Sequence, residues 1–430
     1  MNNYLSKGKR VAARNKTILE NMSWVTAVEV FILIAPLITY PYLVRVLGMD
    51  LYGVIISAQV LASYATIIID FGSNSVVAKH VSINRNNKEM LSEIVCSVFT
   101  VRSFLWLVCL PVFCGVVFLV PVYRNFWLLF LISYGLTLND VLFPRYFFQG
   151  IENMRISSII NICIKLFFIL LVFVLVKDES DYLMVPVLYT TGYALAGLVS
   201  MYIVFGRMKI RFAIPPVKRM MIYVKDSSAI FATDLICTIK DKFNYFLLGG
   251  FSGMANVVVY DLGIKLNVII VKPVQIIGQV LFPRFAKTRD IKRVNLMTTV
   301  VFVLALLTAI IVNIFLPWIV DFFLDTKIDL LPLRIFTLAP VFLAVSSFLA
   351  GNFFIAFGHN KYMLYSILVT TSAYLLALGF VVVTNKMSSV YSFVSISLFS
   401  YFVEFIYRMV TKARLVKKGP EVTEVENVKF

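Results

Sequence analysis

The sequence is poor in charged residues. Only 15% of its 430 residues are Asp, Glu, Lys or Arg, whereas 60% are hydrophobic. A soluble domain carries about a quarter charged residues, because its surface must be hydrated. This scarcity of charge excludes a soluble globular protein and predicts a chain that lies almost entirely within a membrane.

Histidine and paired cysteine are also scarce. The chain has two histidines, His80 and His359, and five cysteines, which all lie in apolar stretches and form no CxxC pair. Zinc sites and disulfide frameworks need clustered or regularly spaced ligands. We therefore expect no metal, no cofactor and no disulfide, and we interpret the cysteines as small apolar residues.

Motifs of catalysis are missing as well. No GxxxxGK[ST] phosphate loop occurs, so nothing indicates ATP hydrolysis. Asp178, Glu179 and Asp181 share one short connector, where a solvated turn is a simpler interpretation than a catalytic set. No connector exceeds about twenty residues, which is short for a membrane polymerase or glycosyltransferase. The sequence predicts a protein that is not an enzyme.

Long hydrophobic runs are abundant instead. A hydrocarbon core of about 30 Å takes about 20 helical residues to cross. Twelve such runs with short connectors account for nearly the whole chain, which predicts an all-α integral membrane protein of about 12 transmembrane helices. The runs lie near residues 22–44, 51–70, 94–119, 123–143, 156–176, 182–204, 228–250, 256–281, 296–320, 331–356, 361–384 and 388–410.

The basic residues alternate between the two sides of these runs. The formal net charge of +17 would suggest nucleic acid as a partner of a soluble protein, but here we expect none. Most Lys and Arg residues lie on the odd-numbered sides, and the basic N-terminal flank, with no cleavage site after it, is retained rather than a secretory signal. The positive-inside rule then places both termini in the cytoplasm. The even-numbered loops hold only Arg45, Arg124, Lys177, Lys327 and Lys386.

Two weak matches predict an internal repeat of six spans. The segment from Phe147 to Arg155 is similar to that from Phe353 to Lys361, and Leu47-Gly48 is similar to Leu248-Gly249. Such a duplication is typical of transporters whose two bundles move about a central site. The predicted parts are a cytoplasmic N-terminal segment (1–21), a first six-helix bundle (22–205), a basic linker (206–226), a second bundle (227–410) and a cytoplasmic tail (411–430).

Polar residues within the runs are the main candidates for function, because an ionisable group in hydrocarbon costs several kcal/mol. In the eighth run, five polar residues fall on one stripe of the helix, within about 40° either side of Asp261, and extend over a rise of about 27 Å. Pro273 can kink this helix, as Pro36, Pro41 and Pro111 can kink others. The five residues are Asp261, Lys265, Lys272, Gln275 and Gln279.

The seventh run adds Asp234, Lys240, Asp241 and Lys242. These aspartates either neutralise neighbouring lysines in a sealed core or belong to a polar path. The four lysines of the two runs exceed their three aspartates, which favours a path with a positive surplus. Arg102 and Lys165 are either further cationic candidates or side chains that snorkel to the interface. Glu29 and Asp70 are weaker acidic candidates, and Glu404 has Arg408 at the i+4 position.

One segment resembles a known family. It runs from Pro36 through Pro41-Tyr42, Arg45 and Leu47-Gly48 to Tyr52-Gly53, and Asp70-Phe71-Gly72 follows. This pattern is similar to the opening of Wzx-type polysaccharide-lipid flippases of the MATE-like MOP exporter superfamily, and looser matches extend over nearly the whole chain. They include Tyr260, Lys265-Leu266, Pro273, Phe282-Pro283, Gly351-Asn352 and Gly358.

The resemblance implies two six-helix bundles around a central cavity that opens alternately to each side of the bacterial inner membrane. The implied substrate is an undecaprenyl-diphosphate-linked oligosaccharide repeat unit for O-antigen or capsule synthesis. A polysaccharide polymerase and a chain-length regulator are implied partners, besides the membrane lipids. In this scheme the cationic cavity would comprise Lys240, Lys242, Lys265, Lys272, Arg102, Lys165, Gln275 and Gln279, and the coupling-ion candidates would be Asp234, Asp241, Asp261, Glu29 and Asp70.

Two other functions remain open on the sequence alone. A cation-coupled small-molecule exporter would share the helix pattern, although exporters of cationic drugs are expected to line their cavity with carboxylates. A polysaccharide polymerase is the less favoured alternative.

Overall fold

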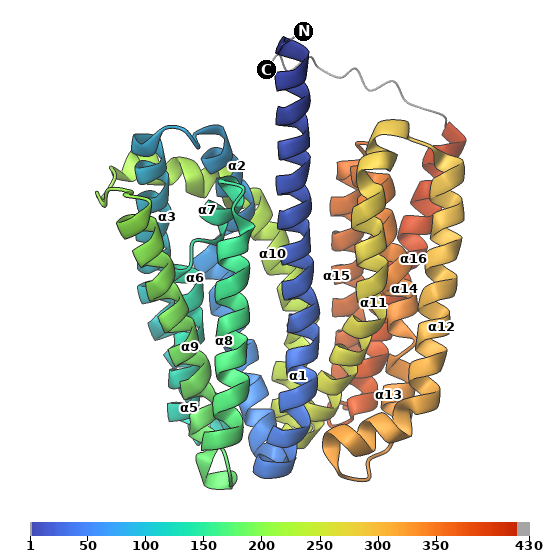
Figure 1. Cartoon of the computed structure of the whole chain (residues 1–430). Helices are drawn as coiled ribbons and strands as arrows, with labels where there is room; N and C mark the ends of the chain where they lie inside the picture. Colours follow the sequence, from blue (N-terminus) through green and yellow to red (C-terminus); the bar gives the residue numbers. More distant parts are fainter. Residues whose placement is uncertain (1, 419–430) are drawn as a thin grey trace. The chain divides into compact units, whose positions relative to one another are not determined.

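The computed structural model describes the backbone of residues 2–418 and the side chains of residues 37–417, together with those of 31, 34 and 35. The regular structure of this part of the chain is entirely helical (Figure 1). Ten of its helical segments are long and apolar enough to cross a membrane, judged by length and composition. The predicted all-α membrane fold is confirmed.

Two features relate these ten segments to the twelve predicted spans. The helix α1 (Asn2–Asp70) changes direction at Gly48, whose φ is 73° and ψ 164°, so it provides the first two spans. The helix α10 (Val217–Phe251) has 35 residues and corresponds to the seventh span, although it is not among the ten. Its charged side chains lower its hydropathy below that of an ordinary membrane helix. The predicted break at Arg45–Gly48 is confirmed.

Backbone contacts divide the chain into two compact units. The first unit comprises residues 1–258 and 322–325, and the second comprises residues 259–321 and 326–430. The predicted boundaries of the bundles and of the linker 206–226 stay a prediction. The helix α10 begins within that predicted linker, packs on α1 and α2 (Ser73–Ile83), and belongs to the first unit.

The first unit has a cluster of buried apolar residues, most of which come from α2, α3 (Lys88–Leu119) and α7 (Arg145–Gly150). Phe71, Val81, Ile94 and Phe148 are members of this cluster. Besides α1 and α10, the elements of the unit are α2 (Ser73–Ile83), α3 (Lys88–Leu119), α4 (Pro121–Arg124), α5 (Trp127–Tyr134), η1 (Gly135–Thr137), α6 (Leu138–Leu142), α7 (Arg145–Gly150), α8 (Met154–Leu175), η2 (Glu179–Leu183), α9 (Met184–Met201) and η3 (Tyr202–Arg207).

The second unit has its own apolar cluster, which includes Val271, Val301, Phe348 and Phe353. Each unit therefore has a core of its own, as expected of separate helical bundles. Its elements are α11 (Met254–Thr288), which begins in the first unit, α12 (Ile291–Leu324), α13 (Leu331–Phe336), α14 (Ala339–Leu349), η4 (Ala350–Ile355), α15 (Asn360–Val383) and α16 (Val390–Lys418).

Two of the prolines that could kink a helix do not end one, whereas a break lies at Pro144. The helix α3 continues through Pro111 and α11 continues through Pro273. The helix of the fourth span is instead interrupted at the end of the predicted run 123–143, between α6 and α7, where Phe143 is extended ahead of Pro144. A proline removes a single backbone donor, so a long helix can tolerate it, whereas the residue before a proline is biased toward the extended region.

The repeat predicted from Phe147 and Phe353 has a counterpart in the backbone. After α7, the amides of Ile151, Glu152 and Asn153 donate to the carbonyls of Phe147, Gln149 and Phe148. After η4, the backbone amides of residues 357, 358 and 359 donate to the carbonyls of residues 353, 355 and 354, which is the same order. Glu152 and Gly358, at matching positions, both have a positive φ, 59° and 84°. The two units therefore use the same turn at the same point of the repeat.

The second predicted match is displaced along the chain. Gly48 was paired with Gly249 by sequence, but Gly249 lies inside α10. The residue with a positive φ is Gly253, at 92°, between α10 and α11. The short Leu-Gly match therefore indicates the region of the junction between α10 and α11, but not the glycine that has the positive φ.

Candidate functional site

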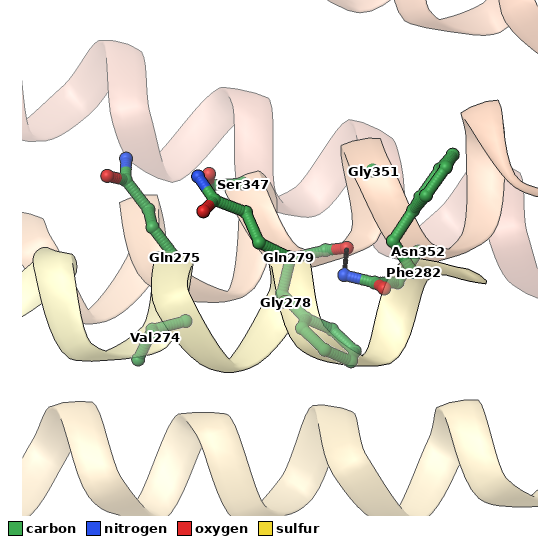
Figure 2. A pocket seen from close by; sticks show the side chains of 9 residues that line it. Val274, Gln275, Gly278, Gln279, Phe282, Ser347, Gly351 and Asn352 are labelled. Carbon is green, nitrogen blue, oxygen red and sulfur yellow. Dashed lines mark hydrogen bonds between the residues drawn. The ribbon is translucent and has the colours of Figure 1, made fainter. Parts of the chain in front are cut away.

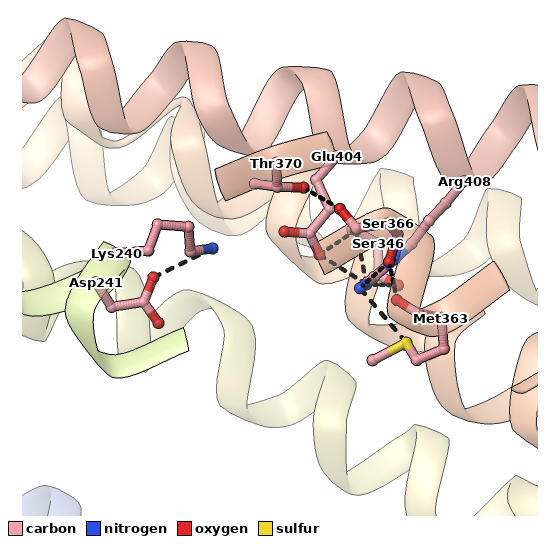
Figure 3. A network of polar contacts seen from close by, with 8 residues as sticks. All are labelled: Lys240, Asp241, Ser346, Met363, Ser366, Thr370, Glu404 and Arg408. Carbon is pink, nitrogen blue, oxygen red and sulfur yellow. Dashed lines mark hydrogen bonds and ion pairs between the residues drawn. The ribbon is translucent and has the colours of Figure 1, made fainter. Parts of the chain in front are cut away.

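Several charges of the predicted polar path are paired on their own helix. On α11, Lys265 forms an ion pair with Asp261 one turn away, and Asp261 is buried. On α10, the Nζ of Lys240 lies 3.2 Å from Asp241 Oδ1 (Figure 3). The interpretation that these aspartates neutralise neighbouring lysines thus has support for two pairs. Their roles in binding or coupling stay predictions.

The remaining candidates on these two helices have different surroundings. Lys242 and Lys272 are half-buried, and Asp234 is exposed. Glu29 lies outside the residues whose side chains the structure describes. Their roles in binding or coupling also stay predictions.

Arg102 is the centre of a buried polar cluster in the first unit. Only 1% of its side chain is exposed, so it does not snorkel. It forms an ion pair with Asp70, donates to Ser73 Oγ over 2.6 Å and donates from Nη1 to the carbonyl oxygen of Asp140 over 2.6 Å. Its guanidinium carbon also lies 5.2 Å from the centre of the Tyr146 ring. Two sequence candidates, Asp70 and Arg102, are therefore joined.

Arg408 is the centre of a buried polar cluster in the second unit (Figure 3). Its Nη1 lies 2.7 Å from Glu404 Oε1, which confirms the pair expected from their i, i+4 spacing. Nη1 also donates to the Ser346 carbonyl over 2.8 Å, and Nε donates to Ser366 Oγ over 3.1 Å. The Ser346 hydroxyl donates to the same carboxylate oxygen over 2.9 Å. The cluster connects α14, α15 and α16.

A polar pocket of about 460 Å³ lies within the second unit. Gln275 and Gln279 point from the same side of α11, and Asn352 of η4 donates from Nδ2 to the Phe348 carbonyl over 3.3 Å (Figure 2). The other lining residues carry no formal charge, so this pocket can offer amide and hydroxyl groups only. They are Val274, Gly278, Phe282, Ser347, Phe348 and Gly351.

A second polar pocket, of about 420 Å³, lies within the first unit and does contain charge. Asp140 and Lys165 both line it. Within the described residues, the Nζ of Lys165 makes no ion pair and no hydrogen bond. A lysine of a membrane span that borders a cavity is a functional candidate by default. The remaining lining residues are Gln59, Ala62, Ser63, Thr66, Leu136, Asn139, Tyr189 and Tyr193.

Most residues of this first-unit pocket are not predicted from the sequence. Only Lys165 was a candidate, whereas Asp140 and its neighbours were not. One signal was present: Gln59, Ser63 and Thr66 follow an i, i+4, i+7 spacing in an otherwise apolar span, which places them on one helical face. The remaining residues come from η1, α6, α8 and α9, and no pattern along the chain indicates that these elements meet.

Comparison with known proteins places the fold. A solved structure of a "multidrug resistance MATE family transporter of the MOP superfamily" in an inward-facing conformation has a TM-score of 0.63 at 12% identity, covering 90% of this chain and 100% of that one. "Lipid II flippase MurJ, inward closed conformation" has a TM-score of 0.63 at 12% identity, covering 92% and 87%. The predicted MATE-like fold is thereby confirmed.

Comparison of sequences identifies the family. A "Putative O-antigen transporter" of Escherichia coli (strain K12) is 22% identical over 282 residues, which are 65% of this chain and 67% of that protein. The sequence profile described as "Polysaccharide biosynthesis protein" matches residues 18–289. Because this match covers more than half of its residues, the chain belongs to the polysaccharide biosynthesis protein family.

Proposed function

We propose that this protein is a flippase that moves an undecaprenyl-diphosphate-linked oligosaccharide repeat unit from the cytoplasmic to the outer leaflet of the bacterial inner membrane. The observation that carries the proposal is the family match over residues 18–289. The similarity to an O-antigen transporter and the MOP fold support it further. The product would enter O-antigen or capsule synthesis, with a polymerase and a chain-length regulator as partners.

The physical task explains why cationic and polar groups would lie in the membrane. A diphosphate-sugar headgroup is anionic and strongly polar, so its transfer into hydrocarbon without partners is prohibitive. Alternating access with lysine and amide side chains along the route lowers that barrier. The chain offers Lys240, Lys242, Lys265, Lys272, Gln275 and Gln279 on α10 and α11, besides Arg102 and Lys165.

A cation gradient is the energy source that we propose. Asp234, Asp241, Asp261, Glu29 and Asp70 are the candidates for binding the coupling ion. Both termini would lie in the cytoplasm, because the basic residues concentrate on that side.

The experiment measures surface polysaccharide in the native host after Lys265→Ala or Lys272→Ala. We expect at least about a tenfold loss, about 1.4 kcal/mol, because each variant removes a cation from the proposed route. Lys292→Ala, at an exposed position of α12, is the matched control and should leave the polysaccharide unchanged. All variants are compared at equal amounts of membrane-inserted protein.

Two results would change the proposal. Normal polysaccharide in both variants would remove these lysines from the route. Normal polysaccharide after disruption of the gene, together with drug resistance on expression, would favour the small-molecule exporter, whose fold the chain shares.

A further inference from the structure

The pocket of the first unit combines three kinds of side chain that together suit one class of ligand. It has a cation, Lys165, and a set of hydrogen-bonding groups that includes Asn139 and Asp140. It also has two aromatic rings, Tyr189 and Tyr193. Its volume, about 420 Å³, lies in the range of small-molecule sites.

The aromatic rings on one side of the pocket are stacked. The Tyr189 ring stacks on Phe168, with centroids 3.6 Å apart and 21° between the planes. Tyr193, one turn further along α9, is nearly parallel to Tyr189 at 18° and 6.3 Å. Phe168 itself is buried, so α8 fixes the ring plane from behind. Such rings offer a flat apolar surface beside polar groups.

The polar side of the pocket has unused hydrogen-bonding capacity. The Oδ1 of Asn139 is buried and has no hydrogen-bond partner within the described residues. A buried polar atom without a partner is destabilising, and a ligand or water that donates to it removes this cost. Gln59 lines the same pocket and adds a second planar amide. Planar amide and carboxylate groups can each contact two neighbouring hydroxyls.

The two charges of the pocket are balanced in different ways. Asp140 lies beside the Arg102 cluster, since its carbonyl oxygen accepts from Arg102, and the Thr66 hydroxyl is within reach of its carboxylate. Lys165 has no corresponding partner within the described residues. An unpaired cation in a membrane span is costly, and an anionic ligand would compensate it.

We infer that this pocket binds a sugar ring that carries an anionic group. A pyranose has an apolar C–H face, which fits the tyrosine rings, and an edge of hydroxyls, which fits Gln59, Asn139 and Asp140. The anionic group pairs with Lys165, and it is either a carboxylate of an acidic sugar or the phosphate attached to the first sugar. The inference rests on the proposed function, for which it specifies part of the headgroup.

The test uses saturation-transfer NMR on the full chain in lipid nanodiscs with three soluble probes: glucuronate, glucose 1-phosphate and glucose. We expect transfer to the ring protons of at least one anionic probe, several-fold above that to glucose. Lys165→Gln and Tyr189→Leu should each abolish it, whereas Lys165→Arg should retain it. Lys412→Gln is the matched control, because Lys412 is a buried lysine of α16 that lines neither polar pocket. Unchanged thermal unfolding shows that each variant is folded.

The probes separate the two sources of the negative charge. Transfer to glucuronate alone assigns the pocket to an acidic sugar, and transfer to glucose 1-phosphate alone assigns it to the sugar phosphate. Equal transfer to all three probes, unchanged in Lys165→Gln, would overturn the inference. So would the lack of any transfer in a chain that still delivers polysaccharide to the surface. If anionic probes bind but polysaccharide delivery does not depend on the chain, the inferred ligand class stands and the proposed function is wrong.

Discussion

The two compact units contain similar parts, but they differ in where their charged side chains lie. Each has a polar pocket and a buried arginine held by a carboxylate and serine hydroxyls. In the first unit the pocket holds Asp140 and Lys165, whereas in the second unit it holds amides and a hydroxyl. The first unit therefore presents charge to a cavity, and the second presents neutral polar groups to its own.

The two arginine clusters also differ in whether they contact a residue that lines a pocket. Arg408 and Glu404 are both buried, and the pocket of their unit is lined by other residues. Arg102 instead donates to the backbone of Asp140, a residue that does line a pocket. A buried ion pair with complete partners is a structural element, whereas a charge at a cavity is a functional candidate. The comparison suggests that Arg408 stabilises its bundle and that Arg102 also positions a pocket wall.

Removal of either arginine should have the largest effect. Arg408→Leu leaves Glu404 buried without its cation, which costs about 3–5 kcal/mol of stability, and Arg102→Leu should cost a similar amount through Asp70. Thermal unfolding of the purified protein in detergent, followed by intrinsic fluorescence, measures both. An unchanged unfolding temperature in Arg408→Leu would contradict the structural role of its cluster.

Paired substitutions sharpen the contrast between the clusters. Glu404→Gln with Arg408→Met removes both charges and should recover most of the lost stability. Asp70→Asn with Arg102→Met should recover less, because the carboxylate of Asp140 remains beside the cluster without its arginine neighbour. Equal recovery in the two pairs would mean that the clusters are equivalent.

Substitution of a helical glycine by alanine should have the next largest effect on stability, and the effect should differ between the two units. A Cβ at Gly53, in the first unit, would meet the Met254 carbonyl oxygen at 2.1 Å, and a backbone atom cannot turn aside. Gly53→Ala should therefore cost about 1–3 kcal/mol by overpacking. A Cβ at Gly278, in the second unit, would meet the Asn352 amide nitrogen at 3.0 Å and would be in ordinary van der Waals contact with the Phe348 ring at 3.7 Å.

Gly278→Ala is expected to be neutral or stabilising. The Asn352 side chain borders the pocket and can turn, while alanine is favoured over glycine in a helix by up to about 1 kcal/mol. Denaturation curves of both variants in the same detergent measure the difference. A larger loss in Gly278→Ala than in Gly53→Ala would show that the second-unit pocket is more tightly packed than the first-unit junction.

The sequence predicted the parts of this molecule that depend on local patterns. Hydrophobic runs identified the helices, the i, i+4 spacing identified the Glu404–Arg408 pair, and the similarity of Phe147 and Phe353 identified two matching turns. The pocket around Lys165 depends instead on residues of five elements, α1, η1, α6, α8 and α9, which are spread along the chain from Gln59 to Tyr193. The helices also continue through Pro111 and Pro273, because packing and the remaining backbone hydrogen bonds outweigh one missing donor.

The matching turns provide the comparison of the two units with the smallest expected effects on stability. Glu152 has a φ of 59° in the first unit, where the second unit has Gly358 with a φ of 84°. A residue with a Cβ is strained in this region, whereas glycine is not. Glu152→Gly should therefore raise the free energy of unfolding by about 0.5 kcal/mol. This gain is small because the variant loses the exposed Arg85–Glu152 pair and because glycine has greater freedom in the unfolded chain. Gly358→Ala should lose about 1 kcal/mol. Opposite signs in the two denaturation midpoints would support a shared turn geometry, and equal signs would show that the two turns are constrained by their surroundings rather than by the repeat.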